Sequence, residues 1–320
     1  MRNLTKILIP AFAMVLTFSV PAGATEAATE ENAQVTEAAT ADTVDDTKPL
    51  IALGADLSSE QRQTVLSLMG VTEADLANYN VIYITNDQEH QYLDDYIDAS
   101  VIGSKSLSSV MITPKEAGHG VVVTTQNISY CTTGMYRNAL LTAGVEDADI
   151  LVAGPTQISG TAALIGAVNG YELLSGEEIS DDTLDTALDE MITTGELSAA
   201  LDGANSEDVE ALIAYVKAKL AAGELETDED IRAAIEEGEA QFGVTLSDDE
   251  INQIIDVMHK INELGLDPSV LLDQAADLYE QFGSDFLDHI DAGTIAKTGI
   301  SSFFSNVGKS IKNFFTGLFE

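Results

Sequence analysis

The change in hydrophobic periodicity near residue 175 is the feature that most restricts the fold of this chain. From Pro49 to about Glu172, short apolar runs alternate with amphipathic segments, a pattern typical of strands interleaved with helices. From about Ser175 onward the strand pattern disappears, and segments of helical periodicity with polar caps follow one another. We therefore expect an α+β protein. An N-terminal α/β domain with a small mixed sheet should precede an all-helical acidic domain and a C-terminal amphipathic helix.

The individual elements are predicted from apolar runs, capping residues and glycine stops. Strands are expected over 50–53, 81–84, 108–113, 120–128 and 149–153. In the same region helices are expected over 58–69, 86–97, 132–143 and 159–174. The later helices are expected at about 181–193, 206–222, 228–241, 247–264 and 268–282.

The N-terminus has the pattern of a secretory signal peptide. Arg2 and Lys6 precede an almost wholly apolar run, Ile7–Val20, and a small-residue cleavage site ends at Ala24. Residues 25–48 are rich in Ala, Thr, Glu and Asp and bury too little apolar surface to fold. The predicted division is a signal peptide (1–24), a disordered acidic linker (25–48), the α/β domain (49–175), the acidic helical domain (176–292) and the amphipathic helix (293–320).

Acidic residues far outnumber basic residues. The chain has 54 Asp and Glu against 14 Lys and Arg, a formal net charge of −40. Nucleic acid is excluded as a partner on this ground, because phosphate binding needs clustered Lys and Arg. Three acidic runs follow Ser or Thr, and we interpret them as first turns of helices and not as metal ligands. These runs are Asp181–Asp182, Asp228–Asp230 and Asp248–Glu250.

Two polar segments of the α/β domain are candidates for chemistry. Gly154–Thr161 leads from a predicted strand into a predicted helix, where backbone amides could hold an anion. We favour helix capping by Ser159 or Thr161 there. Ser104–Ser106 places hydroxyls beside Lys105, but the S-x-x-K and G-x-S-x-G spacings of acyl-transfer enzymes do not occur in the sequence. We interpret this segment as a polar loop or strand edge.

The remaining reactive residues indicate no catalytic or metal site. Cys131 is the single cysteine, and its flanks match no nucleophile motif, so we expect a small buried residue near a helix start. No H-x-x-x-H or H-E-x-x-H spacing occurs among the histidines, which are His90, His119, His259 and His289. We assign no catalytic, cofactor-binding or metal-binding residue.

Several motifs in order resemble the YpuA-like secreted proteins of Gram-positive bacteria, a family with a domain of unknown function. The resemblance covers roughly Leu50–Phe286. It implies an exported protein. It supplies no established activity and no catalytic residues that could be assigned to this chain. The motifs that carry it are Leu53–Ser58, Ile84–Asn86, Glu89, Tyr92–Leu93, Ile102–Ser109, Tyr136–Val145, Ser159–Leu164 and Tyr171–Glu172.

The last twenty residues, Ser301–Glu320, carry five of the ten phenylalanines. On a helix, the apolar side chains of this region fall within ~120° of the wheel. This apolar face could pack against one of three surfaces: the protein's own body, a membrane, or a partner protein or second copy of the chain. The candidate membrane-binding or partner-binding residues are Ile300, Phe303, Phe304, Val307, Ile311, Phe314, Phe315 and Leu318.

The sequence as a whole favours a secreted protein associated with the cell envelope. Its biochemical activity is unknown, and a non-enzymatic binding or association module is the leading interpretation. The alternatives are an extracellular hydrolase with a site in the α/β domain, and a membrane-surface-active protein that acts through its C-terminal helix. A polar pocket that gathers Ser104, Lys105, His90 and His119 would favour the hydrolase, and their dispersal would favour binding. No cofactor is expected.

Overall fold

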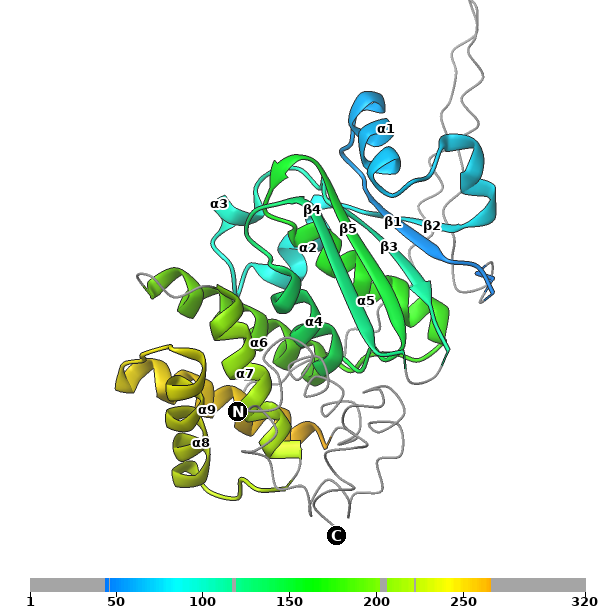
Figure 1. The fold of residues 1–320 in the computed structure, drawn as a ribbon. Helices are drawn as coiled ribbons and strands as arrows, with labels where there is room; N and C mark the ends of the chain where they lie inside the picture. Colours follow the sequence, from blue (N-terminus) through cyan, green and yellow to red (C-terminus); the bar gives the residue numbers. More distant parts are fainter. Residues whose placement is uncertain (1–43, 46, 117–118, 202–205, 222, 266–320) are drawn as a thin grey trace, which may run out of the picture.

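The computed structural model describes residues 44–45, 47–116, 119–201, 206–221 and 223–265 (Figure 1). The strands of this part are β1 (Leu50–Gly54), β2 (Asn80–Ile84), β3 (Ser109–Pro114), β4 (Val121–Ile128) and β5 (Ala148–Ile158). The first helices are α1 (Ser59–Leu68), the 3-10 helix η1 (Glu73–Asn78), α2 (Asn86–Leu93), α3 (Ala99–Ile102), α4 (Thr133–Thr142) and α5 (Thr161–Ser175). The later helices are α6 (Asp181–Ala200), α7 (Ser206–Ala221), α8 (Asp228–Phe242) and α9 (Asp248–Leu264).

The strands form one mixed sheet in the order β2-β1-β3-β5-β4. Strand β1 pairs in parallel with β2, and β5 pairs in parallel with β4. Strand β3 lies between β1 and β5 and is antiparallel to both. In the described part of the chain, β1, β2, β4 and β5 therefore all end at the same edge of the sheet, where β3 begins.

Each face of the sheet has its own core. Ile51 and Leu53 of β1 pack on the α1 side, whereas Leu50 and Ala52 pack on the side of α2, α4, α5 and α6. This alternation follows from the two-residue period of a strand. Helix α5 lies very close to the sheet: a Cβ on Gly166 would lie 2.8 Å from the Ala52 Cβ. Only a glycine lets the helix approach that closely.

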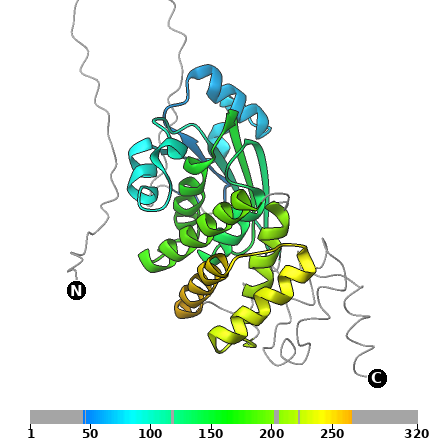
Figure 2. The same cartoon turned by 90° about the vertical axis from the view of Figure 1, so that its left-hand side faces the viewer.

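A third hydrophobic cluster joins α7, α8 and α9. Helix α6 connects it with one of the sheet cores, because Leu184, Leu188 and Met191 pack with the core on the α5 side of the sheet and Leu197 packs with the later helices. Figures 1 and 2 show α1 at one end of the molecule and α8 and α9 at the other. The division at residue 175 stays a prediction, since α6 is shared.

The expected α+β fold class, small mixed sheet and order of elements are confirmed. The three acidic runs begin helices, with Ser180, Thr227 and Ser247 as their N-caps. Helix α2 ends at Leu93 instead of continuing to Ile97. Asp94 and Asp95 follow it directly, and carboxylates are unfavourable at the negative end of a helix. The short helices η1 and α3 were not predicted from the sequence.

The predicted helix at 268–282 and the amphipathic C-terminal helix lie outside the described residues. Within the described part of the chain, no helix combines the length and apolar character that crossing a membrane requires.

Candidate functional site

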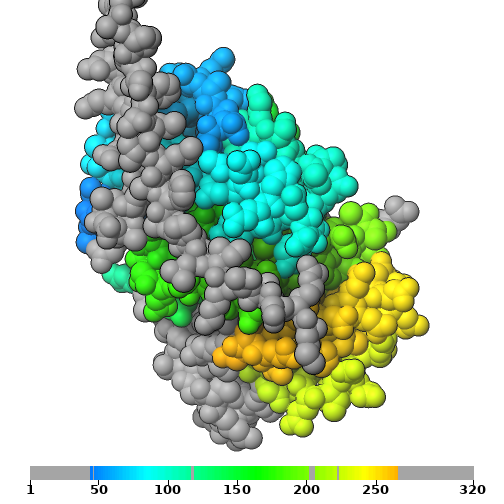
Figure 3. All heavy atoms as spheres, turned by 180° about the vertical axis from the view of Figure 1, so that it is seen from behind, coloured from blue at the N-terminus to red at the C-terminus, as the bar shows by residue number. Residues whose placement is uncertain are grey.

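A polar pocket lies at the carboxyl edge of the sheet, between α2, α3, the loop that enters β3 and the start of α5. Its volume is about 270 Å³. This edge is where open α/β sheets usually bind their ligands, because loops that follow parallel strands meet there. The polar lining residues are Glu89, Ser104, Lys105, Ser108, Ser159 and Thr161. Figure 3 shows the face of the molecule on which the cyan segment with α2 and α3 lies, above α8 and α9 in yellow and orange.

Glu89 is the most deeply placed charged residue of the pocket, with only 1% of its surface exposed. The Thr161 Oγ1 donates a hydrogen bond to its Oε1 at 2.7 Å. The Asn86 Nδ2 makes a long contact to its Oε2 at 3.4 Å. Burial raises the pKa of the Glu89 carboxyl, and these donors oppose the rise. None of the described ion pairs includes Glu89.

The loop before β3 forms one wall of the pocket. Ser108 is buried, and its Oγ accepts the N–H of Ala163 in the first turn of α5 at 2.9 Å. Ser106 is fully buried, and its Oγ makes no hydrogen bond of normal geometry to the described residues. It lies near enough to Glu89 to favour the charged form of that carboxyl. Ser104 and Lys105 are exposed on the same wall.

Helix α5 starts without the expected side-chain cap. Its N-cap is Gly160, with φ 104°, and neither Ser159 nor Thr161 caps the helix, so this prediction was wrong. The Thr161 hydroxyl donates to Glu89 instead, and the Ser159 and Thr161 hydroxyls lie 3.2 Å apart. Both side chains therefore line the pocket.

His90 and His119 do not join Ser104 and Lys105 among the residues that line the pocket. His90 follows Glu89 in α2, but its Nδ1 contacts Asp94 at 2.6 Å and its Nε2 contacts the Gly103 carbonyl at 3.0 Å. These two contacts raise the pKa of the His90 imidazole. His119 contacts Asp149 near the start of β5, at the opposite edge of the sheet.

Cys131 is buried directly before the N-cap of α4, as the sequence predicts. Burial raises the pKa of its thiol to about 12. The Tyr136 hydroxyl beside it donates to the Gly160 carbonyl. A thiol with so high a pKa carries almost no thiolate at neutral pH, so Cys131 is not placed to act as a nucleophile.

A second buried carboxylate, Glu210, lies at the N-terminus of α4. The Thr132 hydroxyl donates to it, and the Gly134 backbone N–H also stabilises its charged form. Burial raises the pKa of the Glu210 carboxyl and is the largest influence on it. Glu89 and Glu210 thus occupy equivalent places, each beside the first turn of a helix that follows a strand.

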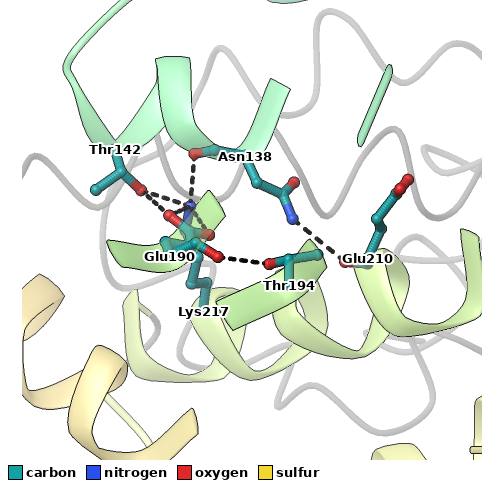
Figure 4. A network of polar contacts seen from close by, with 6 residues as sticks. All are labelled: Asn138, Thr142, Glu190, Thr194, Glu210 and Lys217. Atoms are coloured by element: carbon teal, nitrogen blue, oxygen red, sulfur yellow. Dashed lines mark hydrogen bonds and ion pairs between the residues drawn. The ribbon is translucent and has the colours of Figure 1, made fainter. Parts of the chain in front are cut away.

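A buried ion pair connects α4, α6 and α7 (Figure 4). The side chains of Lys217 and Glu190 are 0% exposed, and their closest N–O distance is 2.8 Å. The Lys217 ammonium also donates to the Thr142 Oγ1 at 2.7 Å and to the Asn138 carbonyl at 3.1 Å. Burial raises the pKa of Glu190 and lowers that of Lys217, and the attraction between the two charges opposes both shifts. Solvent cannot reach this pair, which links the three helices through hydrogen bonds.

The candidate binding residues predicted from the sequence lie elsewhere in the chain. Ile300, Phe303, Phe304, Val307, Ile311, Phe314, Phe315 and Leu318 all lie outside the described residues. Glu89 was missed as a site residue, although its position in the helix gave a signal. It lies four residues before Leu93, on the apolar face that packs against the sheet core. Among the described residues, no group of three His, Cys, Asp or Glu side chains is arranged to hold a metal ion.

Comparison with known proteins identifies relatives over most of the chain. Residues 53–278 match a family model described as a protein of unknown function, DUF1002. The uncharacterized protein YpuA of Bacillus subtilis (strain 168) is 38% identical over 250 residues, which cover 75% of this chain and 84% of the relative. No solved structure matches. The resemblance noted in the sequence is thus confirmed, and the chain belongs to the DUF1002 family.

Proposed function

We propose that this protein is exported and acts as a non-enzymatic binding protein, with its ligand site in the pocket around Glu89. Export is supported by the basic start, the apolar run Ile7–Val20 and the small-residue site at Ala24. The observation that carries the binding site is the Glu89 carboxylate, which is 1% exposed, belongs to no described ion pair and lines an open pocket.

The hydrogen bonds around the pocket favour binding over hydrolysis. An acyl hydrolase needs a nucleophile whose proton is accepted by a positioned base. His90, His119 and His259, the histidines of the described part, contact aspartates or a backbone carbonyl, and none contacts a Ser or Thr hydroxyl. The Cys131 thiol is buried, with a pKa of about 12.

A ligand screen with a blocked pocket tests the proposal. The chain from Thr25 onward would be incubated with a mixed library of small metabolites, and retained compounds would be identified by native mass spectrometry. Ser104 is exposed on the pocket wall, so Ser104→Trp should fill the pocket without disturbing the core. The matched control is Gln91→Trp, at an exposed position of α2 that does not line the pocket.

We expect the wild type and the Gln91→Trp control to retain the same compounds chemically unchanged, and Ser104→Trp to lose them. Retention that is equal in all three proteins would overturn the proposed site. Conversion of a retained compound to a product would overturn the non-enzymatic assignment.

Association with the cell envelope is a separate part of the proposal and depends on the apolar face of Ile300–Leu318. Deletion of Gly299–Glu320 should leave folding intact and abolish binding to liposomes or to the cell surface. Equal liposome binding by the intact and truncated chains would contradict a membrane role. A marked fall in melting temperature on truncation would indicate that the segment packs on the protein's own body.

A further inference from the structure

Two opposite charges line the Glu89 pocket without pairing with each other. Glu89 is a buried lining residue, and Lys105 is an exposed one. Neither residue belongs to an ion pair within the described part of the chain. An unpaired lysine is notable in a chain with 14 basic and 54 acidic residues, because acidic partners are abundant.

The hydrogen-bonding capacity of Glu89 is only partly used. A carboxylate can accept about four hydrogen bonds. Glu89 receives one good hydrogen bond, from Thr161 at 2.7 Å, one long contact, from Asn86 at 3.4 Å, and a favourable interaction with the nearby Ser106 hydroxyl. A buried carboxylate is stabilised most by a positive charge within hydrogen-bond distance, and a neutral hydroxyl would leave its charge uncompensated. A ligand ammonium would supply both this positive charge and several N–H donors.

The rest of the pocket restricts the body of the ligand. Apolar side chains complete the lining, and they are Val101, Ile102, Leu107 and Ile158. The pocket volume of about 270 Å³ is near the lower end of ligand sites. A short aliphatic molecule fits this description. Lys105, as a compact positive charge, suits a carboxylate on that molecule and disfavours a second ammonium.

We propose that the Glu89 pocket binds a small aliphatic zwitterion of the amino-acid class, with the ligand's ammonium at Glu89 and its carboxylate at Lys105. This inference rests on the proposed function, because it names the ligand class of the same pocket.

Three compounds with the same aliphatic body test the two charges separately. L-leucine carries both groups, 3-methylbutylamine lacks the carboxylate, and 4-methylpentanoate lacks the ammonium. Their dissociation constants for the chain from Thr25 onward would be measured by titration calorimetry at neutral pH. We expect L-leucine to bind at least about tenfold more tightly than either analogue. Loss of one charge pair in a partly desolvated site raises the dissociation constant by about tenfold or more.

Variants of the two charged residues should change selectivity in opposite ways. In Glu89→Gln the ammonium is no longer recognised, so L-leucine and 4-methylpentanoate should bind equally weakly. In Lys105→Ala the carboxylate is no longer recognised, so L-leucine and 3-methylbutylamine should bind alike. The matched controls are Glu172→Gln, a half-buried carboxylate away from the pocket, and Lys115→Ala, a lysine paired with Asp149 at the other edge of the sheet.

The stability of Glu89→Gln separates a binding role from a structural role. If Glu89 is kept for ligand binding, its replacement should raise the melting temperature of the free protein and remove the increase that L-leucine causes. A structural carboxylate would lower the melting temperature when it is replaced. Circular dichroism at 222 nm would measure both quantities.

The possible failures can be told apart. Equal affinities for the three compounds, or L-leucine binding that Glu89→Gln leaves unchanged, would overturn the zwitterion inference. If L-leucine does not bind but the library screen yields a sugar or another compound without an ammonium, and Ser104→Trp loses it, the binding function stands and the ligand class is wrong. If Ser104→Trp alters no retention at all, the proposed function itself fails.

Discussion

Removal of the buried lysine should be among the most damaging single changes in this protein. Lys217→Met would leave Glu190 fully buried without its cation, since both side chains are 0% exposed. Breaking one side of a buried ion pair typically costs about 3–5 kcal/mol. For a chain of this size each kcal/mol lowers the melting temperature by roughly 2–4 °C, so a fall of about 6–20 °C is expected.

The measurement is urea unfolding followed by circular dichroism, because the chain contains no Trp for fluorescence. Lys260→Met is the matched control. Lys260 pairs with Asp189, the residue next to Glu190, but the Lys260 side chain is 51% exposed. A surface pair of this kind contributes about 0–1 kcal/mol. Both lysines pair with a carboxylate of α6, but Lys217 is buried and also donates to Thr142 and Asn138.

A combined variant tests whether the loss of stability comes from the buried, unpaired charge of Glu190. Lys217→Met, Glu190→Leu and Thr142→Val together remove both charges and the hydroxyl that contacts them. Well-packed apolar replacements of buried pairs are often neutral, so the combined variant should unfold within about 2 kcal/mol of the wild type. A loss no larger for Lys217→Met than for Lys260→Met would refute the reasoning. So would a combined variant whose loss equals the sum of the single changes.

Three further predictions concern the buried groups near the sheet. Gly134→Ala should destabilise the protein by about 1–3 kcal/mol, because the new Cβ would collide with the Glu210 carboxylate; unchanged stability would show that Glu210 does not lie there. Burial raises the pKa of Glu89 in the folded protein. The neutral Glu89 carboxyl therefore stabilises the folded protein fully below the pKa of Glu in the unfolded chain, which is about 4. This stabilisation is lost as the pH rises through the higher pKa of Glu89 in the folded protein. Melting curves between pH 4 and 8 should show the wild type losing stability relative to Glu89→Gln as pH rises, whereas parallel curves would contradict the shift. Cys131 should react with a maleimide slowly in the native protein and rapidly in urea, and fast native labelling would contradict its burial.

Local features of the sequence were sufficient to predict most elements. The capping boxes of Ser58 with Gln61 and of Ser247 with Glu250 both form, because each depends only on residues three positions apart. Strand order was not predictable in this way. Strands β3 and β4 follow each other in the chain, yet β5 lies between them in the sheet. The strand order depends on which apolar faces pack together in the folded chain. The sequence of a single segment does not contain that information.

The pocket was harder to predict than the fold for a related reason. With 54 acidic residues in the chain, no single carboxylate is informative on its own. What distinguishes Glu89 is its burial and its contact with Thr161, which is 72 positions away. Lys217 likewise depends on Glu190 from another helix. The loop over 104–106 was correctly interpreted as polar, but its place on the wall of a pocket follows only from the fold.

The positions of Glu89 and Glu210 also bear on which ligands the proposed site would accept. Helices that follow strands in α/β proteins commonly hold phosphate groups at their first turn, because the free N–H groups and the helix dipole attract anions. Here the Thr161 and Thr132 hydroxyls at the starts of α5 and α4 already serve carboxylates of the protein itself. A nucleotide or sugar phosphate that approached either helix would meet a negative charge in the place where its own should bind. If the proposed site binds a ligand, this arrangement should disfavour phosphorylated compounds at the edge of the sheet where open α/β sheets most often bind their ligands.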